Sequence, residues 1–191
     1  HNSVAKHVKN LKSIVSFGIE LGLLDKNPFQ GYQFGYKETP QVILTTEELF
    51  RIESKCFDMP RLELVRNLFL FQCYTGLSYI DMAGLTHQNI VKGNDNNDWL
   101  VLNRTKSKIP VRIPLLSKAK HIIFLYNEVI LTTSKPLLPM YANQKMNSYL
   151  KEIADLCGIK KNLTSHVGRR TFATTVLLSN GIPIETVSKL L

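Results

Sequence analysis

The residues with the clearest chemical potential lie in the segment TSHVGRRTFAT, residues 164–174. A Thr–Ser pair ahead of helix-compatible residues predicts that a helix begins here. On that helix His166 and Arg169 are three residues apart and share a face, and Arg170 lies close to it. A proton-transfer group and a guanidinium at the positive end of a helix together favour the binding of one phosphate. Because His-x-x-Arg is short, the same residues would equally suit an ordinary solvated helix start.

The charge balance of the chain indicates an anionic partner. Of 191 residues, 24 are Lys or Arg and 15 are Asp or Glu, which gives a net charge of +9 and a sequence pI of about 9.5. This excess favours nucleic acid, and an acidic membrane surface would satisfy it equally well. The longest weakly polar run, residues 68–80, is too short to cross a bilayer, and the N-terminal residues show no signal peptide pattern.

Cysteine usage bears on the compartment. Cys56, Cys73 and Cys157 are widely spaced within apolar segments and form no Cys-x-x-Cys pair. An odd number of such residues predicts buried, reduced thiols and a cytoplasmic protein.

The N-terminal part predicts one amphipathic helix followed by a linker. Apolar residues recur at helical spacing from Val4 to Val15 with lysines between them, and Pro28 ends the pattern. Residues 30–41 have no period, which places a domain boundary near Pro40. Forty residues are too few to bury a core. Since the chain also begins with His1 rather than Met, we expect residues 1–40 to be the tail of an upstream domain in a longer protein.

Residues 41–191 predict a mostly helical domain with one small β-hairpin, of the α+β class. A capping box from Thr45 to Glu48 begins the first helix. Further helices are expected at about 61–74, 78–85, 117–131, 143–157, 165–180 and from 184. Residues 99–103 and 109–115 predict two strands joined by a loop at 105–108. Pro110 and Pro114 confine the second strand to a sheet edge.

Three separated stretches are similar to one protein family, the tyrosine recombinases or phage-type integrases. TGLSYID (75–81) resembles the family's box I, TKSKIPVRIPL (105–115) resembles the β-hairpin that carries its catalytic lysine, and SHVGRRTFA (165–173) resembles its His-x-x-Arg box. Each box is weak alone, and the three in this order with matching secondary structure are specific. The residues of the three boxes are most similar to those of integrases of conjugative transposons.

The resemblance implies a fold and a domain organisation. Residues 41–191 are expected to form a tyrosine recombinase catalytic domain, the DNA breaking-rejoining fold, which is mainly helical with a small antiparallel sheet. Residues 1–40 are expected to be the last helix and linker of a core-binding, SAM-like domain.

The resemblance also implies an activity, site-specific DNA recombination that integrates and excises a mobile element. In the family a tyrosine hydroxyl attacks a DNA phosphodiester, leaving a 3′-phosphotyrosyl link and a free 5′-hydroxyl. The bond energy stays in the covalent intermediate, so no cofactor and no metal is expected. The expected partners are double-stranded DNA attachment sites and identical subunits, from dimer to tetramer, and not a membrane.

Roles follow by position in the matching motifs. Arg169 would clamp the non-bridging oxygens, His166 would assist proton transfer, and Lys106 would protonate the leaving 5′-oxygen. Asp81 would orient an active-site cation. The less favoured alternatives are that Lys106 is a plain solvated loop lysine and that Asp81 is an acid on the surface of a helix. Further DNA contacts are expected from Lys108, Arg112 and Arg170.

Box I departs from the family pattern. The position directly after Thr-Gly-Leu is usually an arginine, and here it is Ser78. A hydroxyl cannot supply the charge of a guanidinium, and removing one such donor typically costs about 10²–10³ in rate. We therefore predict a substitute arginine. Arg104 is preferred because it is two residues before Lys106, so on an extended strand both would point to one side; Arg112 is the second candidate.

The nucleophile is the second departure. In the family, the tyrosine and a second His or Trp lie beyond the His-x-x-Arg helix, and no tyrosine of this sequence has a matching place. We expect the chain to be truncated before the tyrosine, and therefore to bind DNA without cleaving it. Tyr74 and Tyr79, which flank box I, are expected to be packing residues.

Two other classes of function compete. The missing box I arginine leaves room for a non-catalytic, sequence-specific DNA-binding protein derived from or resembling a recombinase. A metal nuclease would need clustered carboxylates, for which Asp95 and Asp98 are poor candidates.

Overall fold

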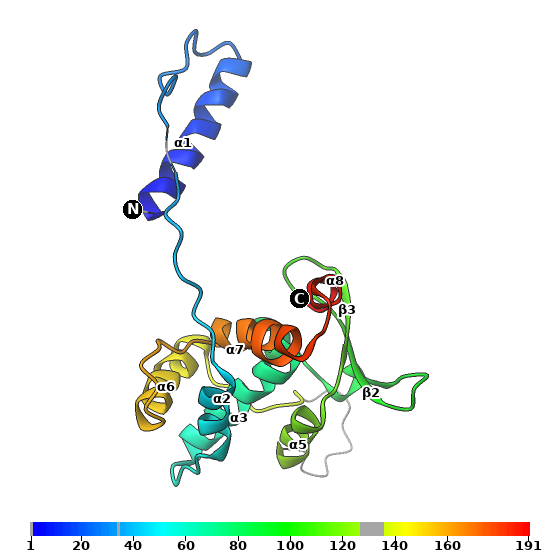
Figure 1. The fold of residues 1–191 in the computed structure, drawn as a ribbon. Helices are drawn as coiled ribbons and strands as arrows, with labels where there is room; N and C mark the ends of the chain where they lie inside the picture. Colours follow the sequence, from blue (N-terminus) through cyan, green and yellow to red (C-terminus); the bar gives the residue numbers. More distant parts are fainter. Residues whose placement is uncertain (1, 34, 127–135) are drawn as a thin grey trace. The chain divides into compact units, whose positions relative to one another are not determined.

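A computed structural model of the chain describes residues 2–33, 35–126 and 136–191. The chain divides into two compact units, residues 1–41 and residues 42–191 (Figure 1). The division lies beside Pro40, where the sequence places a domain boundary. The first unit contains one long helix, and the second contains helices α2 to α8 and a three-stranded sheet.

The first unit consists of helix α1 (Asn2–Glu20) and an irregular segment whose far end returns to the start of the helix. The side chain of Asn2 makes two hydrogen bonds of 2.9 Å with the main chain of Lys37. The helix is present as predicted, and within this unit its apolar side is incompletely covered: Val4 is 59% exposed and Leu11 48%. A unit of this length has too little chain to cover that side.

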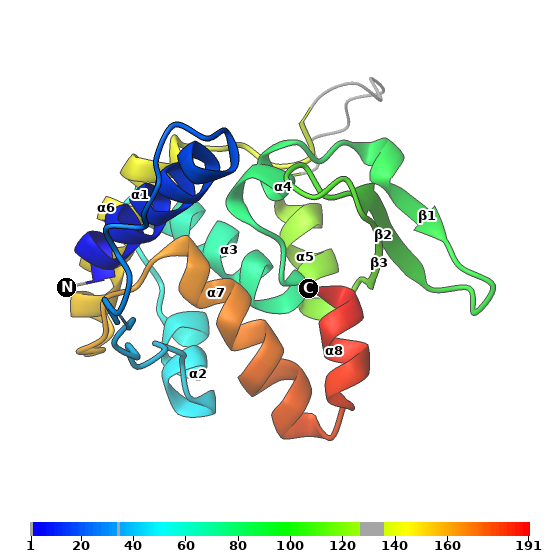
Figure 2. The same ribbon diagram turned by 90° about the horizontal axis from the view of Figure 1, so that it is seen from above.

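Helix α3 (Pro60–Thr75) is the central element of the second unit. Every residue from Asn67 to Thr75 is buried, which explains why this part of the helix is apolar on nearly all sides. Helices α5, α6 and α7 pack around it (Figure 2). Helix α2 (Thr46–Ser54) precedes it and begins with the predicted capping box of Thr45 and Glu48.

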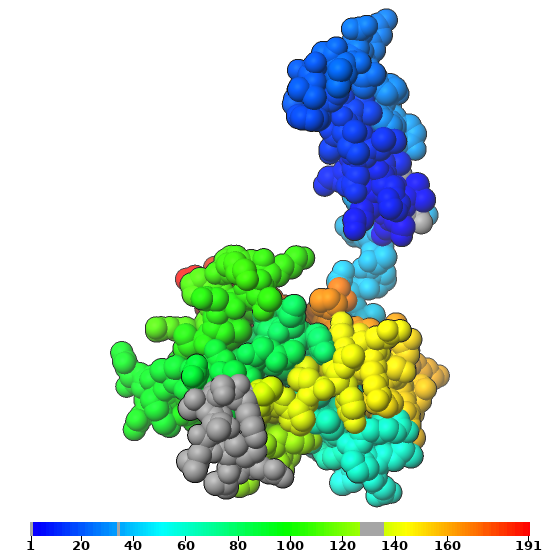
Figure 3. All heavy atoms as spheres, turned by 180° about the vertical axis from the view of Figure 1, so that it is seen from behind, coloured from blue at the N-terminus to red at the C-terminus, as the bar shows by residue number. Residues whose placement is uncertain are grey.

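The sheet is antiparallel with strand order β1-β2-β3. Strands β2 (Asp98–Asn103) and β3 (Pro110–Pro114) are the two predicted strands, and β3 lies at an edge, as its prolines require. Strand β1 (Ile90–Lys92) follows a 3-10 turn at His87–Asn89 and is not among the predicted strands. Three residues are too few to show the alternation of apolar and polar residues that predicts a strand. In the space-filling view the strands and their turns (green) form one end of the second unit (Figure 3).

The remaining helices are α4 (Tyr79–Ala83), α5 (Ser117–Tyr126), α6 (Asn143–Leu156), α7 (Ser165–Thr171) and α8 (Ile184–Leu190). The helix predicted at 117–131 is present to Tyr126, and residues 127–131 lie outside the described residues. The helix predicted at 165–180 is continuous but changes type, because α7 passes into a π-helical segment (Phe172–Leu177) and a 3-10 turn (Leu178–Asn180). Helix α8 packs against β3.

The segment that enters the second unit is fastened to the helix that follows the His-x-x-Arg motif. Leu44 is fully buried, and its N–H donates to Thr171 Oγ1 at 3.0 Å. The hydroxyl of Thr175 donates to the carbonyl of the same leucine. These two threonines are four residues apart, so one side of the helix satisfies both main-chain groups of Leu44.

Of the three free cysteines, Cys73 and Cys157 are buried as predicted, and burial raises the pKa of both thiols. The prediction is wrong for Cys56, which is exposed. It lies in the loop between α2 and α3 and not in a packed segment.

Candidate active site

The turn at Gly76, directly after α3, lies beside the arginines of the site and contacts Arg169. Helix α3 ends at Gly76, whose φ of 65° is left-handed and favours glycine. A Cβ at Gly76 would lie 2.3 Å from Cδ1 of Phe172, so the turn and the helix that carries the arginine motif touch directly. The carbonyl of Gly76 accepts a hydrogen bond of 2.7 Å from Arg169 Nη1.

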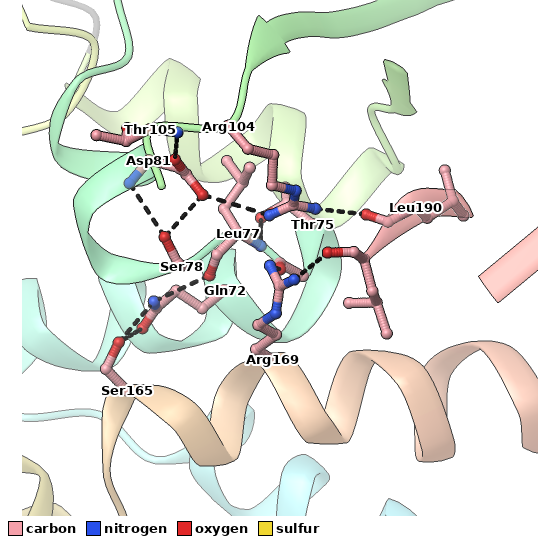
Figure 4. Close-up of polar contacts among 12 residues, drawn as sticks. Gln72, Thr75, Leu77, Ser78, Asp81, Arg104, Thr105, Ser165, Arg169 and Leu190 are labelled. Carbon is pink, nitrogen blue, oxygen red and sulfur yellow. Dashed lines mark hydrogen bonds and ion pairs between the residues drawn. The ribbon is translucent and has the colours of Figure 1, made fainter. Parts of the chain in front are cut away.

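Asp81 lies at the centre of a hydrogen-bond network that joins box I to the β2–β3 hairpin (Figure 4). Ser78 is the N-cap of α4, and its hydroxyl donates to Asp81 Oδ2 at 2.7 Å. The N–H of Thr105, at the start of the hairpin turn, donates to Asp81 Oδ1 at 2.8 Å. Burial alone would raise the pKa of this carboxyl, but the bonds from Thr105 and Ser78 and the charge of Arg104 lower it below its usual value.

Arg104 completes this network from the end of β2. Its side chain is 9% exposed, and Nη1 lies 3.3 Å from Asp81 Oδ2 in an ion pair. Nη2 donates to the carbonyl of Leu190 at 2.6 Å, which ties the arginine to α8. Arg104, the predicted substitute for the box I arginine, is thus held by Asp81 on one side and by the main chain of Leu190 on the other.

Arg104 and Arg169 point toward the same place (Figure 4). Arg169 donates to the carbonyls of Gly76 and Leu191. Burial lowers the pKa of Arg169, and the nearby positive charge of Arg104 lowers it further. Two like charges brought together, one buried and the other partly buried, favour an anion between or beside them. Each guanidinium has five N–H groups, and the described residues accept from only two nitrogens of each, so donors remain for a ligand.

Gln72 is a supporting residue of the site that is not among the residues predicted from the sequence. It is fully buried in α3, where its side chain exchanges two hydrogen bonds with the hydroxyl of Ser165, of 2.7 and 3.0 Å, and donates to the carbonyl of Leu77. The amide therefore links the box I turn to the first residue of α7. A lone glutamine within the apolar run of residues 68–80 is the signal that would have found it.

The other predicted site residues lie closer to solvent. Lys106 and Lys108 are exposed on the hairpin turn, and Lys108, with φ of 60°, closes that turn by donating its N–H to the carbonyl of Arg104 at 2.8 Å. His166 and Arg170 are exposed on α7. These side chains are available to a large ligand such as a DNA duplex.

One geometric premise of the prediction is wrong. Arg104 and Lys106 do not share one side of an extended strand, because β2 ends at Asn103 and the chain turns at once. Arg104 is buried and Lys106 exposed as a result. Arg112, the second candidate, lies in β3 opposite Val101 and is exposed on the sheet, away from the Asp81 network.

Tyr74 and Tyr79 are packing residues. The hydroxyl of Tyr79 donates to the carbonyl of Tyr141 at 2.7 Å. Tyr74 is 6% exposed, and its hydroxyl is held between Glu53 and Lys118. Both hydroxyl groups are therefore occupied by structural contacts.

The two acids considered for a metal nuclease have other partners. Asp95 accepts hydrogen bonds from Trp99 and Asn97, and Asp98 forms ion pairs with Lys92 and Lys120. In the part of the chain that the structure describes, no three His, Cys, Asp or Glu side chains are grouped so that they could hold a metal ion. Nor does any described helix combine the length and apolar character needed to cross a membrane.

The sequence pattern of the phage integrase family matches residues 43–191, which is the whole second unit apart from its first residue. The chain belongs to the phage integrase family. A search of curated proteins found no match. The matched range contains the three boxes and every predicted site residue.

Solved integrase structures share the fold of this family member. The Tn1549 transposon integrase in complex with circular intermediate DNA aligns with a TM-score of 0.72 at 16% identity, over 99% of this chain and 70% of that one. A lambda integrase tetramer bound to a Holliday junction gives 0.74 at 17% identity, over 96% and 54%. XerA recombinase gives 0.60 at 19% identity, over 80% and 56%.

Proposed function

We propose that this integrase-family chain contributes the phosphate site of a site-specific DNA recombinase, in which Arg104 and Arg169 together hold the scissile phosphate. The observation that carries the proposal is the convergence of these two guanidinium groups, one of them locked by Asp81 (Figure 4). The fold supports it, since integrases of similar structure have been solved in complex with DNA.

The chemistry proposed is an in-line phosphoryl transfer. A tyrosine hydroxyl gives its proton to His166 or to water and forms a bond to phosphorus, while the bond to the 5′-oxygen breaks and that oxygen gains a proton. Negative charge gathers on the non-bridging oxygens in the transition state, where two preorganised guanidinium groups are most effective. Lys106, exposed on the hairpin turn, is the proposed proton donor to the 5′-oxygen, and His166 the assisting group on α7.

The proposed partners are double-stranded DNA and further copies of the same subunit. The similar lambda integrase structures are a dimer on a core site and a tetramer on a Holliday junction. The excess of positive charge in this chain suits a duplex, whose phosphates would be contacted by Lys108 and Arg170. Such an enzyme would work in the cytoplasm on the DNA of a mobile element, and a conjugative transposon is the proposed class.

Single-turnover cleavage of a nicked attachment-site duplex by the native full-length protein tests this proposal. Arg104→Ala is expected to lower the cleavage rate by about 10²–10³ while duplex affinity changes little. Lys151→Ala, which removes an exposed cation of α6, is the control and is expected to cleave at a near-normal rate. Wild-type rates for Arg104→Ala would overturn the assignment of Arg104.

A non-catalytic DNA-binding protein is the second candidate function. The observation that favours it is Ser78, whose hydroxyl is fully engaged with Asp81 and offers the phosphate nothing in place of the usual arginine. Arg169→Lys separates the two functions, because a lysine keeps the charge but loses the fork. A recombinase loses cleavage and keeps DNA binding, whereas a protein that only binds shows no cleavage in either form.

A further inference from the structure

A cavity of about 470 Å³ opens on the outer face of the sheet, away from the active-site network. The strand register places Val91, Trp99 and Val101 on this face with Arg112, whereas Leu100 and Ile113 face the core. The cavity runs from Arg112 to the β1–β2 turn, residues 93–97. Its volume is in the range of small-molecule sites and is sufficient for one nucleotide.

Trp99 forms the aromatic wall of this cavity in a fixed orientation. Its Nε1 donates to Asp95 Oδ1 at 3.0 Å. The indole lies against Gly93, where a Cβ would approach Nε1 to 2.5 Å, so only glycine permits this placement. A partly exposed ring held in this way offers a preorganised stacking surface.

Arg112 supplies an uncompensated cation at the other end. It makes no ion pair or hydrogen bond with any residue that the structure describes, whereas Lys92, also on the cavity wall, is paired with Asp98 at 2.7 Å. Arg112 lies directly opposite Val101 and diagonal to Trp99 in the register. A guanidinium and an indole are therefore placed on one face with the cavity between them.

We propose that this cavity binds one unpaired nucleotide of a DNA strand, with the base stacked on Trp99 and the phosphate on Arg112. The last strand pair before the hairpin turn is Asn103 with Pro110, and Arg112 lies two residues from it. Trp99 is two residues farther from the turn than Val101, the partner of Arg112. The cationic end is thus the one nearer Lys106 and the proposed scissile phosphate. The inference rests on the proposed function, since strand exchange is what produces an unpaired strand beside this hairpin.

The composition of the cavity favours a nucleotide over an acidic peptide. Stacking on an aromatic ring beside a basic group is the usual means by which single strands are held without base-specific contacts. A carboxylate side chain would use Arg112 but would leave the indole surface without a partner. Asp95 also lines the cavity, beside Trp99, and its negative charge would repel a second phosphate there, which favours a single nucleotide.

Trp99 is the only tryptophan in the chain, so its fluorescence reports this cavity alone. The experiment titrates residues 1–191 at low salt with a 5′-phosphorylated single-stranded tetradeoxyadenylate, and in parallel with tetraglutamate and with a blunt duplex. Saturable quenching by the tetranucleotide and none by the peptide is the expected result. Equal quenching by tetraglutamate, or no quenching by the tetranucleotide, overturns the proposal.

Charge-matched variants complete the test. Arg112→Gln is expected to weaken tetranucleotide binding by roughly tenfold or more, and Lys151→Gln, which removes an exposed lysine of α6, by less than twofold. Equal losses in the two variants would mean general electrostatic attraction and would contradict the proposal. Trp99→Leu, followed with a labelled tetranucleotide and checked by thermal denaturation, should weaken binding as well; unchanged affinity in a folded Trp99→Leu protein contradicts it.

The duplex arm separates this inference from the proposed function. Duplex binding is measured separately, by the fluorescence anisotropy of a labelled duplex. If the wild-type chain binds the duplex but the tetranucleotide does not quench Trp99, the cavity assignment fails and the recombinase proposal stands. If neither DNA binds, the proposed function fails together with it.

Discussion

Arg104 and Asp81 form an ion pair in which both side chains are almost completely buried, 9% and 4% exposed, with 3.3 Å between Nη1 and Oδ2. The two residues lie 23 positions apart, one at the end of β2 and the other in α4. A buried pair of this kind contributes little net stability, but the loss of one partner leaves an uncompensated charge in the interior. The pair therefore fixes the position of Arg104 beside Arg169 and penalises changes at either end.

Asp81→Asn is expected to destabilise the second unit by about 3–5 kcal/mol, because it leaves the Arg104 charge unpaired. The carboxyl of Asp81 has a pKa below its usual 3.8, so its contribution to stability is present above that pH and is lost as the pH falls toward the folded-state pKa. The difference in the free energy of unfolding between wild type and variant should therefore shrink as the pH falls below about 3.8. Urea denaturation at several pH values measures this, with the exposed Asp155→Asn as control. If the difference in the free energy of unfolding between wild type and Asp81→Asn did not depend on pH, the stabilising role of the ion pair would be contradicted.

Gly76→Ala is expected to cost at least about 2 kcal/mol, the sum of a left-handed backbone penalty and an overlap with Phe172 at 2.3 Å. Gly181→Ala is the matched control, because Gly181 has a φ of 78° but no atom within 4 Å of the added Cβ. Thermal denaturation of the two variants separates the two contributions. Equal losses of stability would show that the contact between the box I turn and the helix after Arg169 is unimportant.

Thr171→Val is expected to destabilise the second unit by about 1–3 kcal/mol, because it leaves the buried N–H of Leu44 without an acceptor. Thr174→Val is the control, since its hydroxyl only donates to the carbonyl of Arg170. Hydrogen exchange at the Leu44 amide provides the local measurement. Unchanged protection of that amide in Thr171→Val would contradict the assigned bond.

The sequence predicts the helices, the hairpin and the capping box because each has a strong local signal. It fails for β1, which is too short to alternate, and for the π-helical segment after α7, which contacts Leu44 and Gly76 far away in the sequence. Gln72 shows why supporting residues are harder to predict from the sequence: its role depends on a hydrogen bond to Ser165, 93 positions away. No local pattern carries that information.

Arg104 shows the same limit within the site. Its spacing from Lys106 predicts a place in the site, but the chain turns after Asn103 and separates the two side chains. What places Arg104 in the network is its contact with Asp81 and Leu190, which only the fold supplies. Arg104 stays the preferred candidate for the substitute arginine, but the expectation that it shares one side of a strand with Lys106 is wrong.

The most direct test of the account is charge rescue at the scissile phosphate. In the native full-length protein, the cleavage rate of Arg104→Ala is compared on a normal duplex and on one whose scissile phosphate is replaced by a methylphosphonate, which lacks the negative non-bridging oxygen. If Arg104 neutralises that charge, its loss should slow cleavage of the normal duplex by about 10²–10³ and have little effect on the neutral one. Asp81→Asn, which acts through the position of Arg104, should show the same pattern more weakly. A defect of equal size on both substrates would contradict the claim that Arg104 and Arg169 hold the phosphate together.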